Sequence, residues 1–206
     1  VENCNVSGIT FAGNVGFGAG IATSSTNSLY KGVKATNIDS SITGETWGFR
    51  VQPLNQGGAF FPTLNNVSGN IFEHCVVENV GNGALSPDNQ GGFLIKSVST
   101  FVNENNIIKD SISRGNIGHG VLIDGSEAKN NIVQNNKISK NTKDGINDNT
   151  GLIANKNVYR SNEAYKNTVA NYVGISVATG TPISLWDLTG NAVPVTQGAF
   201  DNLNII

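Results

Sequence analysis

Short apolar stretches separated by Asn recur along the chain. Six hexads align, each beginning with a bulky apolar or aromatic residue, and five of the six end in Val or Ile. They read VENCNV (1–6), VKATNI (33–38), FEHCVV (72–77), IIKDSI (107–112), VQNNKI (133–138) and YRSNEA (159–164). An internal repeat of this kind is typical of solenoid proteins, in which one structural unit stacks on the next.

A second pattern follows each hexad, in which a Gly is followed directly by Ile, Val or Phe. The six copies read GIAT (20–23), GFRV (48–51), GFLI (92–95), GVLI (120–123), GIND (145–148) and GISV (174–177). Apolar residues at alternate positions predict a β-strand. The Gly before each strand is consistent with a tight bend at the corner of a coil. No amphipathic helix of three turns is visible.

One coil per repeat, with two or three short strands in each, predicts an all-β parallel solenoid of about six coils. Asn suits the turns, because it tolerates the left-handed backbone region, and stacked Asn side chains can hydrogen-bond in ladders. We assign residues 1–178 to this solenoid. The repeat stops after that point, and residues 179–206 are expected to form a C-terminal cap or docking tail of the same domain.

The Asn-rich turns and the G-(I/V/F)-x-(I/V) strands resemble the right-handed parallel β-helix, or pectin-lyase-like, superfamily. The resemblance covers roughly residues 1–178 and implies a right-handed β-helix. The superfamily includes pectate lyases, polygalacturonases, alginate epimerases, phage tailspikes and surface proteins without known activity. The resemblance therefore specifies the fold and leaves the function open.

The two cysteines occupy one column of the aligned hexads. Cys4 and Cys75 stand at the fourth position of the first and third copies, two coils apart. Two coil spacings amount to about 9.6 Å, whereas a disulfide needs Cα atoms within about 7 Å. We predict two free thiols.

Composition excludes several classes of partner. Only 14% of the residues are charged and the net charge is −2, which argues against nucleic-acid binding, since that requires a basic face. No apolar run approaches the ~20 residues of a membrane span. The expected partners are other protein subunits, at the solenoid ends or through the C-terminal tail, and possibly a polysaccharide. The expected location is extracellular or on a cell or particle surface.

When the second strands of successive coils are aligned, residues at the same position form a column along the solenoid. Two such columns bring ionisable residues together. His119 and Asp144 are neighbours one coil apart, in a column that the alignment continues to Val173. Lys96 and Asp124 are neighbours in a second column. A His–Asp pair beside a Lys and a carboxylate can perform acid–base catalysis. The alternative is structural, because opposite charges on neighbouring strands stabilise a sheet face by a few tenths of a kcal/mol.

Four further residues are candidate ligand contacts. Trp47 lies in the column of His119, and Arg50 lies on the same strand as Trp47. Phe60 and Phe61 are adjacent in a long loop, where they either anchor the loop or contact a sugar or protein.

Enzyme motifs of the superfamily are incomplete. Gly118-His119-Gly120 resembles the GHG motif of polygalacturonases, but the Asn-Thr-Asp, Asp-Asp and Arg-x-Lys motifs of that family are missing at the matching positions. The Tyr-Gly-Phe-Asp-Pro-His signature of alginate epimerases is absent. No cofactor is expected. Calcium is a weak alternative, since Asp144 and Asp148, with Asn147 and Asn149 nearby, carry suitable oxygens.

Two functional hypotheses follow. The first is a non-catalytic surface or structural module, on a cell envelope or virion, that acts in assembly or glycan adhesion. Low charge and incomplete enzyme motifs favour it. The alternative is a polysaccharide lyase or glycoside hydrolase with His119, Asp144, Asp124 and Lys96 at its centre.

Overall fold

The computed structural model describes residues 1–11, 17–40, 45–53, 65–83, 86–151, 157–174, 183–186, 192–195 and 203–205. Within these ranges the secondary structure consists of short β-strands and one 3-10 helix, η1 (Pro87–Asn89). None of the described residues belongs to a helix that is long and apolar enough to cross a membrane.

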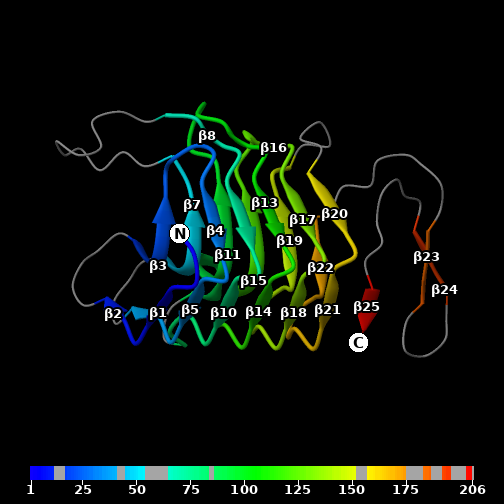
Figure 1. The fold of residues 1–206 in the computed structure, drawn as a ribbon. Coiled ribbons are helices and arrows are strands. Elements are labelled where there is room, and N and C mark those ends of the chain that lie inside the picture. Colours follow the sequence, from blue (N-terminus) through cyan, green and yellow to red (C-terminus); the bar gives the residue numbers. More distant parts are fainter. Residues whose placement is uncertain are drawn as a thin grey trace.

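Four parallel sheets run along the molecule (Figure 1). The five-strand sheet contains β4 (Leu29–Lys31), β9 (Ile71–Glu73), β13 (Ile107–Lys109), β17 (Ile132–Gln134) and β20 (Val158–Arg160). The seven-strand sheet contains β1 (Asn5–Ser7), β5 (Lys34–Thr36), β10 (Val76–Glu78), β14 (Ile112–Arg114), β18 (Lys137–Ser139), β21 (Glu163–Tyr165) and β25 (Leu203–Ile205).

The two other large sheets follow the same order. The six-strand sheet contains β3 (Phe17–Thr23), β7 (Glu45–Val51), β11 (Gln90–Lys96), β15 (His119–Asp124), β19 (Ile146–Asn149) and β22 (Tyr172–Val173). The three-strand sheet contains β8 (Val67–Ser68), β12 (Asn103–Glu104) and β16 (Ala128–Lys129). Two small pairs complete the list: β2 (Thr10–Phe11) with β6 (Asp39–Ser40), and β23 (Ile183–Trp186) with β24 (Ala192–Val195).

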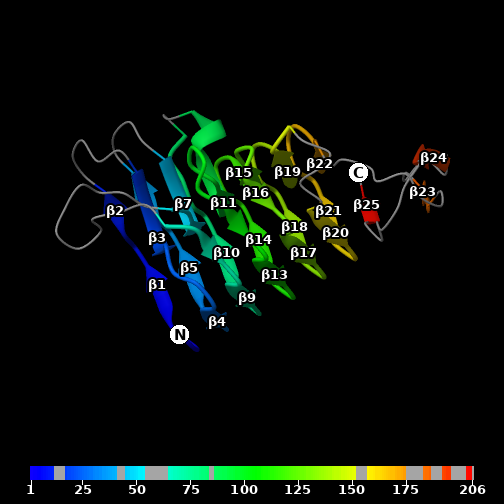
Figure 2. The ribbon, with the colours of Figure 1, turned by 90° about the horizontal axis from the view of Figure 1, so that it is seen from above.

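Each strand pairs in parallel with the strand that occupies the same place in the next coil, so the predicted parallel β-helix is confirmed. Seen from above, the coils follow one another in sequence order from β1 to β22 (Figure 2). Residues in the same column come from chain segments about one coil apart. A functional site on such a fold is therefore assembled from several coils on one face.

Left-handed residues make the turn between the five-strand and seven-strand sheets. In every coil the residue between the two strands has a φ between 51° and 64°. These residues are Asn3, Gly32, His74, Asp110, Asn135 and Ser161. Asn, Asp, His and Gly are the residues that enter this region most readily, and with Ser161 five residue types meet the same backbone requirement. His74 thus lies in an exposed turn, whereas its neighbours in the hexad suggested that it lies within a strand.

Buried Asn side chains form ladders along the axis. Asn131 illustrates the pattern: its Oδ1 accepts from both the backbone N–H and the Nδ2 of Asn106, while its own N–H and Nδ2 donate to Asn157. Asn70 donates to Asn106 in the same way, which extends this ladder through four coils. Two similar ladders include Asn136–Asn162 and Asn116–Asn141–Asn167. The ladders satisfy buried amides that would otherwise destabilise the turns.

Inward side chains form one continuous core. Aromatic rings stack between adjacent coils: Tyr30 on Phe72, with centroids 4.8 Å apart, and Phe49 on Phe93, with centroids 5.0 Å apart. Asp148 is an exception, because this carboxylate is buried and accepts a hydrogen bond of 2.7 Å from the hydroxyl of Tyr159. Burial, and then the negative charge of Asp148, raise the pKa of Tyr159 well above its usual value.

The hexad alignment was wrong in two coils. In the second coil the strand pairing places Tyr30 and Ala35, rather than Val33 and Ile38, in the first and last hexad columns. In the fourth coil Ser113 points inward, where apolar periodicity favoured Ile112. The Ser113 hydroxyl donates to the carbonyl oxygen of Gly120, and this internal hydrogen bond compensates for its burial.

The second-strand alignment was correct in five coils and wrong in the sixth. Ile146 pairs with Tyr172, so the strand of this coil begins three residues earlier than the GISV segment implied. Val173 consequently stands beside Asn147 and not in the column of His119 and Asp144. Residues 175–177 of that segment lie outside the described residues.

The tail also contributes to the sheets. β25 pairs in parallel with β21 and forms the seventh strand of the seven-strand sheet, while β23 and β24 form an antiparallel pair. Figure 1 shows β25 beside the last coil. β25 thus continues the seven-strand sheet, and the assignment of residues 179–206 as a cap or docking tail stays a prediction.

Both thiols are free, as the column spacing predicted. β5 lies between β1 and β10, so a whole coil separates Cys4 from Cys75. Cys4 is exposed, whereas burial raises the pKa of Cys75 to about 11.

We expect a thiol-specific chromogenic reagent at neutral pH to modify one cysteine rapidly in the native protein and both in denaturant, because only the thiolate reacts. Cys4→Ser should abolish the fast phase and Cys75→Ser should retain it. Equal rates for the two thiols in the native protein would contradict this packing.

Candidate functional site

A cleft of about 300 Å³ lies on the outer face of the six-strand sheet. The side chains that line it come from β7, β11, β15 and β19, together with the segment of η1. They are Glu45, Trp47, Asp88, Asn89, Leu94, Lys96, His119, Leu122, Asp124, Asn147 and Asn149. Sequence periodicity predicted Trp47, Lys96, His119 and Asp124 on this face, and all four line the cleft.

The floor of the cleft is apolar. Leu94 and Leu122 are paired on adjacent strands and pack with Trp47 in a cluster separate from the main core. They face outward because they alternate with inward residues such as Phe93 and Val121. Trp47 is only 1% exposed, so its ring is a buried part of the floor and does not offer an open stacking face.

An ion network covers one end of the floor. Glu45 lies 2.7 Å from the Nη1 of Arg50 and 3.0 Å from the Nζ of Lys96. Lys96 also lies 3.4 Å from Asp124, which accepts a hydrogen bond from Asn149. Arg50 is 2% exposed and donates to Gln52. Arg50 therefore positions Glu45 from below, and Lys96 is held between two carboxylates.

His119 and Asp144 form a buried pair at the cleft. The Nδ1 of His119 lies 3.2 Å from the Oδ2 of Asp144, and both residues are 3% exposed. Asn147 donates a hydrogen bond to the same Oδ2 atom. Burial is the largest influence on the pKa of His119 and lowers it, although Asp144 acts in the opposite direction. Burial therefore favours the neutral form of His119.

A second ion pair closes the same side of the cleft. Lys143 donates to the carboxylate of Asp88, which belongs to η1. This hydrogen bond is the main reason that the pKa of Asp88 is lowered. The pair connects the segment before β11 with the turn before β19 and places charged groups near His119.

Several polar side-chain atoms at this face are buried without a hydrogen-bond partner among the described residues, although Glu45, Arg50 and His119 lie in ion pairs. Two others lack such a pair. They are the indole Nε1 of Trp47 and the Oδ1 of Asp144. Thr46 Oγ1, on the same strand as Trp47, is a third. Buried polar atoms are normally paired, as the Asn ladders of this protein illustrate. These atoms are closed to solvent, so a molecule in the cleft would contact the exposed polar side chains that line it instead.

Other predicted residues lie elsewhere. Asp148 points into the core towards Tyr159, so it does not converge with Asp144, Asn147 and Asn149 as a calcium site would require. Phe60 and Phe61 lie outside the described residues.

The glycines that flank His119 are required by packing. Gly118 has a φ of +109°, and a Cβ there would lie 2.5 Å from the carbonyl oxygen of Pro87. Gly120 is one of the corner glycines, and a Cβ on it would lie 2.6 Å from the carbonyl oxygen of Gly145. Two of the three residues that resemble the GHG motif are therefore explained by packing. His119 is the one residue of the three that could take part in chemistry.

Column reasoning missed Glu45, Asp88 and Asn89. Glu45 begins β7, and the other two belong to an insertion between β10 and β11. Insertions break the repeat, so alignment of repeats says nothing about where their side chains point. The one available signal was the Ser-Pro-Asp segment 86–88, in which Ser86 accepts a hydrogen bond from the N–H of Asp88 and starts the 3-10 turn.

The low pKa of His119 predicts a pH dependence of stability. Since the folded-state pKa lies below the unfolded value of about 6.5, the unfolded chain binds more protons between those two values. The free energy of unfolding should therefore fall as the pH drops below about 6.5. Chemical unfolding of the wild type and His119→Gln should show a steeper loss in the wild type between pH 7 and pH 5. An NMR titration midpoint for His119 above 6.5 would contradict this.

Comparison with known proteins adds little beyond the fold. No family model matches the chain, and no curated protein matches it. Among solved structures, the A-module of the mannuronan C-5 epimerase AlgE6 from Azotobacter vinelandii aligns with 84% of this chain and 38% of its own length. The identity is 16% and the TM-score is 0.39, values that carry no argument about activity. What the strand pairing itself shows is that the chain folds as a parallel β-helix, with a polar cleft over an apolar floor on one of its sheets.

Proposed function

We propose that this protein is a glycan-binding β-helix module whose cleft on the six-strand sheet holds part of a polysaccharide. The observation that carries the proposal is the cleft itself, in which polar side chains such as Lys96, Asp124 and Asn147 surround an apolar floor. Ligand sites commonly combine an apolar floor with a few placed polar groups. Sugars fit this combination, because they offer hydroxyl donors and acceptors around C–H faces.

The charges of the cleft favour a neutral or weakly charged glycan. Lys96 is flanked by Glu45 and Asp124, Lys143 pairs with Asp88, and burial favours the neutral form of His119. Among the described residues, each lysine at the cleft already pairs with an acidic side chain. A polyanion would have to compete with these carboxylates. A module of this kind acts at a cell or particle surface, by adhesion or in an assembly with other subunits.

Binding to a panel of neutral and acidic oligosaccharides, measured by calorimetry, tests the proposal. Asn149→Trp places a large side chain on the exposed rim of the cleft and is expected to reduce affinity at least about tenfold. The matched control is Lys137→Trp, which adds the same bulk to an exposed position on the seven-strand sheet. Equal affinity in both variants would remove the cleft as the binding site.

The second candidate function is acid–base chemistry on the bound glycan. The buried imidazole of His119 beside Asp144 is the observation that favours it. Because Asp144 lies at Nδ1, the other ring nitrogen is available to accept a proton from a sugar, and Asp144 would stabilise the resulting imidazolium. Lys96 and Asp124 lie at the other end of the cleft, where they contact substrate rather than the pair.

A depolymerisation screen separates the two functions. Polysaccharides are incubated with the protein, with and without calcium, and new reducing ends or unsaturated products are measured. An enzyme should lose about 10²–10⁴-fold in rate in His119→Ala. Glycan binding without product in the wild type would leave the module as a binder.

A further inference from the structure

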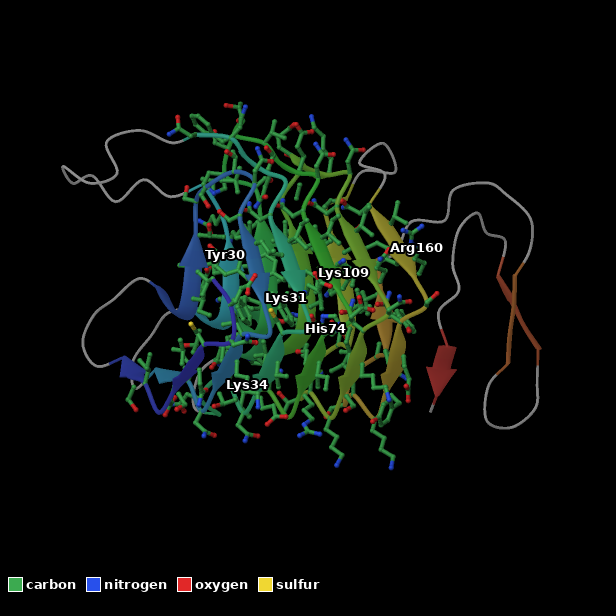
Figure 3. The ribbon with its side chains drawn as sticks, viewed as in Figure 1. Tyr30, Lys31, Lys34, His74, Lys109 and Arg160 are labelled. Carbon is green, nitrogen blue, oxygen red and sulfur yellow. The ribbon has the colours of Figure 1, made fainter. Side chains whose placement is uncertain are left out.

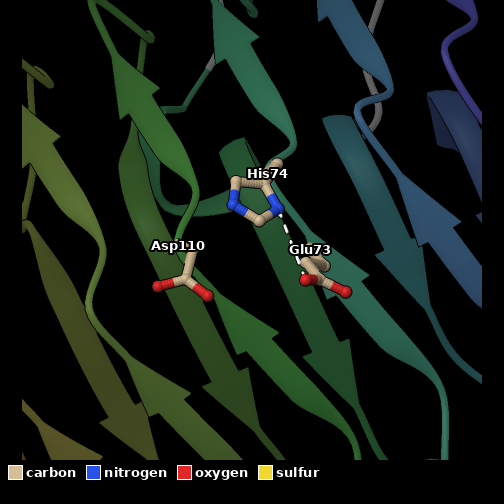
Figure 4. Close-up of side chains that lie close together, drawn as sticks. All are labelled: Glu73, His74 and Asp110. Carbon is tan, nitrogen blue, oxygen red and sulfur yellow. Dashed lines mark ion pairs between the residues drawn. The ribbon is translucent and has the colours of Figure 1, made fainter.

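A second cluster of chemically active side chains lies away from the cleft. Glu73, His74 and Asp110 each place a potential metal-ligating atom within 4.8 Å of the others. Figure 4 shows their side chains together at the turn after β9. In the part of the chain that the structure describes, this is the one group of three or more His, Cys, Asp or Glu side chains with such spacing. It shares no residue with the cleft.

The fold itself sets this spacing. Glu73 ends β9, His74 is the left-handed residue that follows, and Asp110 is the left-handed residue of the next coil. The N–H of His74 donates to the carbonyl oxygen of Lys109, which holds the two turns in register. Parallel stacking therefore brings the imidazole and the second carboxylate together from chain positions far apart in sequence.

The three side chains have no strong competing bonds among themselves. The Nδ1 of His74 lies 3.4 Å from the Oε1 of Glu73. The carboxylate of Asp110 accepts no hydrogen bond from another described residue, and the side chain of His74 is 59% exposed. All three are thus accessible to an ion from solvent.

Lys109 is the cation that pairs with this cluster. Its Nζ lies 3.6 Å from Glu73, in the outward column that also holds Lys31 and Arg160. Figure 3 shows Lys31, Lys109 and Arg160 along this face with His74 beside them. In the absence of a metal ion, Lys109 neutralises part of the charge of Glu73, and an ion that binds there has to displace it.

We propose that Glu73, His74 and Asp110 bind one divalent transition-metal ion, with Zn²⁺ as the probe ion. Zn²⁺ binds both imidazole nitrogen and carboxylate oxygen, and a site with three protein ligands keeps a position open for water. The imidazole distinguishes the site from a calcium site, because Ca²⁺ takes oxygen ligands. Water or a group of a bound molecule fills the remaining coordination positions.

The column of left-handed residues supplies variants that keep the turn. Asn already occupies this place at Asn3 and Asn135, so His74→Asn and Asp110→Asn preserve the backbone while they remove a ligand. Glu104→Gln is the matched control, since Glu104 also precedes a left-handed residue, Asn105, on another turn. Lys109→Met removes the competing ammonium group.

Calorimetric titration with ZnCl₂ should show one saturable site in the full chain. His74→Asn should abolish it, Asp110→Asn should weaken it at least about tenfold, Lys109→Met should tighten it and Glu104→Gln should leave it unchanged. The chain has two histidines, so NMR gives an independent reading in which Zn²⁺ shifts the imidazole signals of His74 and not those of His119. No saturable binding, or binding unaffected by His74→Asn, would overturn the proposal, whatever the outcome of the glycan experiments.

Discussion

Replacing Gly120 by Ala is expected to lower the free energy of unfolding by about 3 kcal/mol. Gly120 belongs to a column of corner glycines at which the six-strand and seven-strand sheets approach each other closely. An added Cβ would collide with the side chain of Ile138, lie 2.6 Å from the carbonyl oxygen of Gly145 and lie 2.8 Å from the Nδ2 of Asn141. The carbonyl oxygen of Gly145 accepts a hydrogen bond from the N–H of Val121. It cannot move away from the added Cβ without breaking the pairing of β15 with β19, so the overlap is not easily relieved.

Gly83→Ala is the matched control, because a Cβ at Gly83 meets no atom within 4 Å. Its effect should stay within about 0.5 kcal/mol. Urea unfolding followed by circular dichroism measures both variants. Equal midpoints for the two would mean that the coil corner is wider than the structure shows.

The second large effect is expected at Asn131. Asn131→Ala should cost about 3 kcal/mol, because it leaves the backbone N–H of Asn106 without its acceptor and removes one of the two acceptors of the Asn106 Nδ2, the other being Asn103. It also removes the donation from Nδ2 to Asn157. The expected loss exceeds that of an ordinary surface substitution because every group involved is buried.

The control for Asn131 is Asn89→Ala, at an exposed Asn in the 3-10 turn. Hydrogen exchange gives a second reading of the ladder, since the amide of Asn106 should lose protection in Asn131→Ala. A variant as stable as the wild type, with unchanged exchange at Asn106, would show that water replaces the ladder at no cost.

Periodicity was enough to predict the architecture. Apolar residues recur at the same place in each coil, and a β-helix needs that recurrence in order to bury a continuous core. The errors occurred where another interaction outweighed apolarity. Ser113 points inward and its hydroxyl bonds to Gly120, and Ala35 takes the place expected for Ile38 because Tyr30, and not Val33, pairs with Phe72 in that coil.

The sequence predicted only those residues of the cleft that recur at the same position in successive coils. His119 with Asp144 and Lys96 with Asp124 are brought together by the stacking of coils, as the alignment indicated. Glu45 and Asp88 reach the cleft from strand starts and insertions, which the repeat does not describe. The proximity of His74 to Asp110 was equally available from the sequence, but the register error in the fourth coil placed Asp110 in the wrong column.

The location of ligand binding tests the account most directly. Isotope-labelled protein, titrated with the oligosaccharides that bind in calorimetry, reports through backbone amide shifts which coils respond. We expect shifts concentrated in β7, β11, β15 and β19, which line the cleft, together with the indole N–H of Trp47 in its floor. Shifts confined to the turns of the seven-strand sheet or to the ends of the solenoid, with the Trp47 indole unchanged, would contradict it.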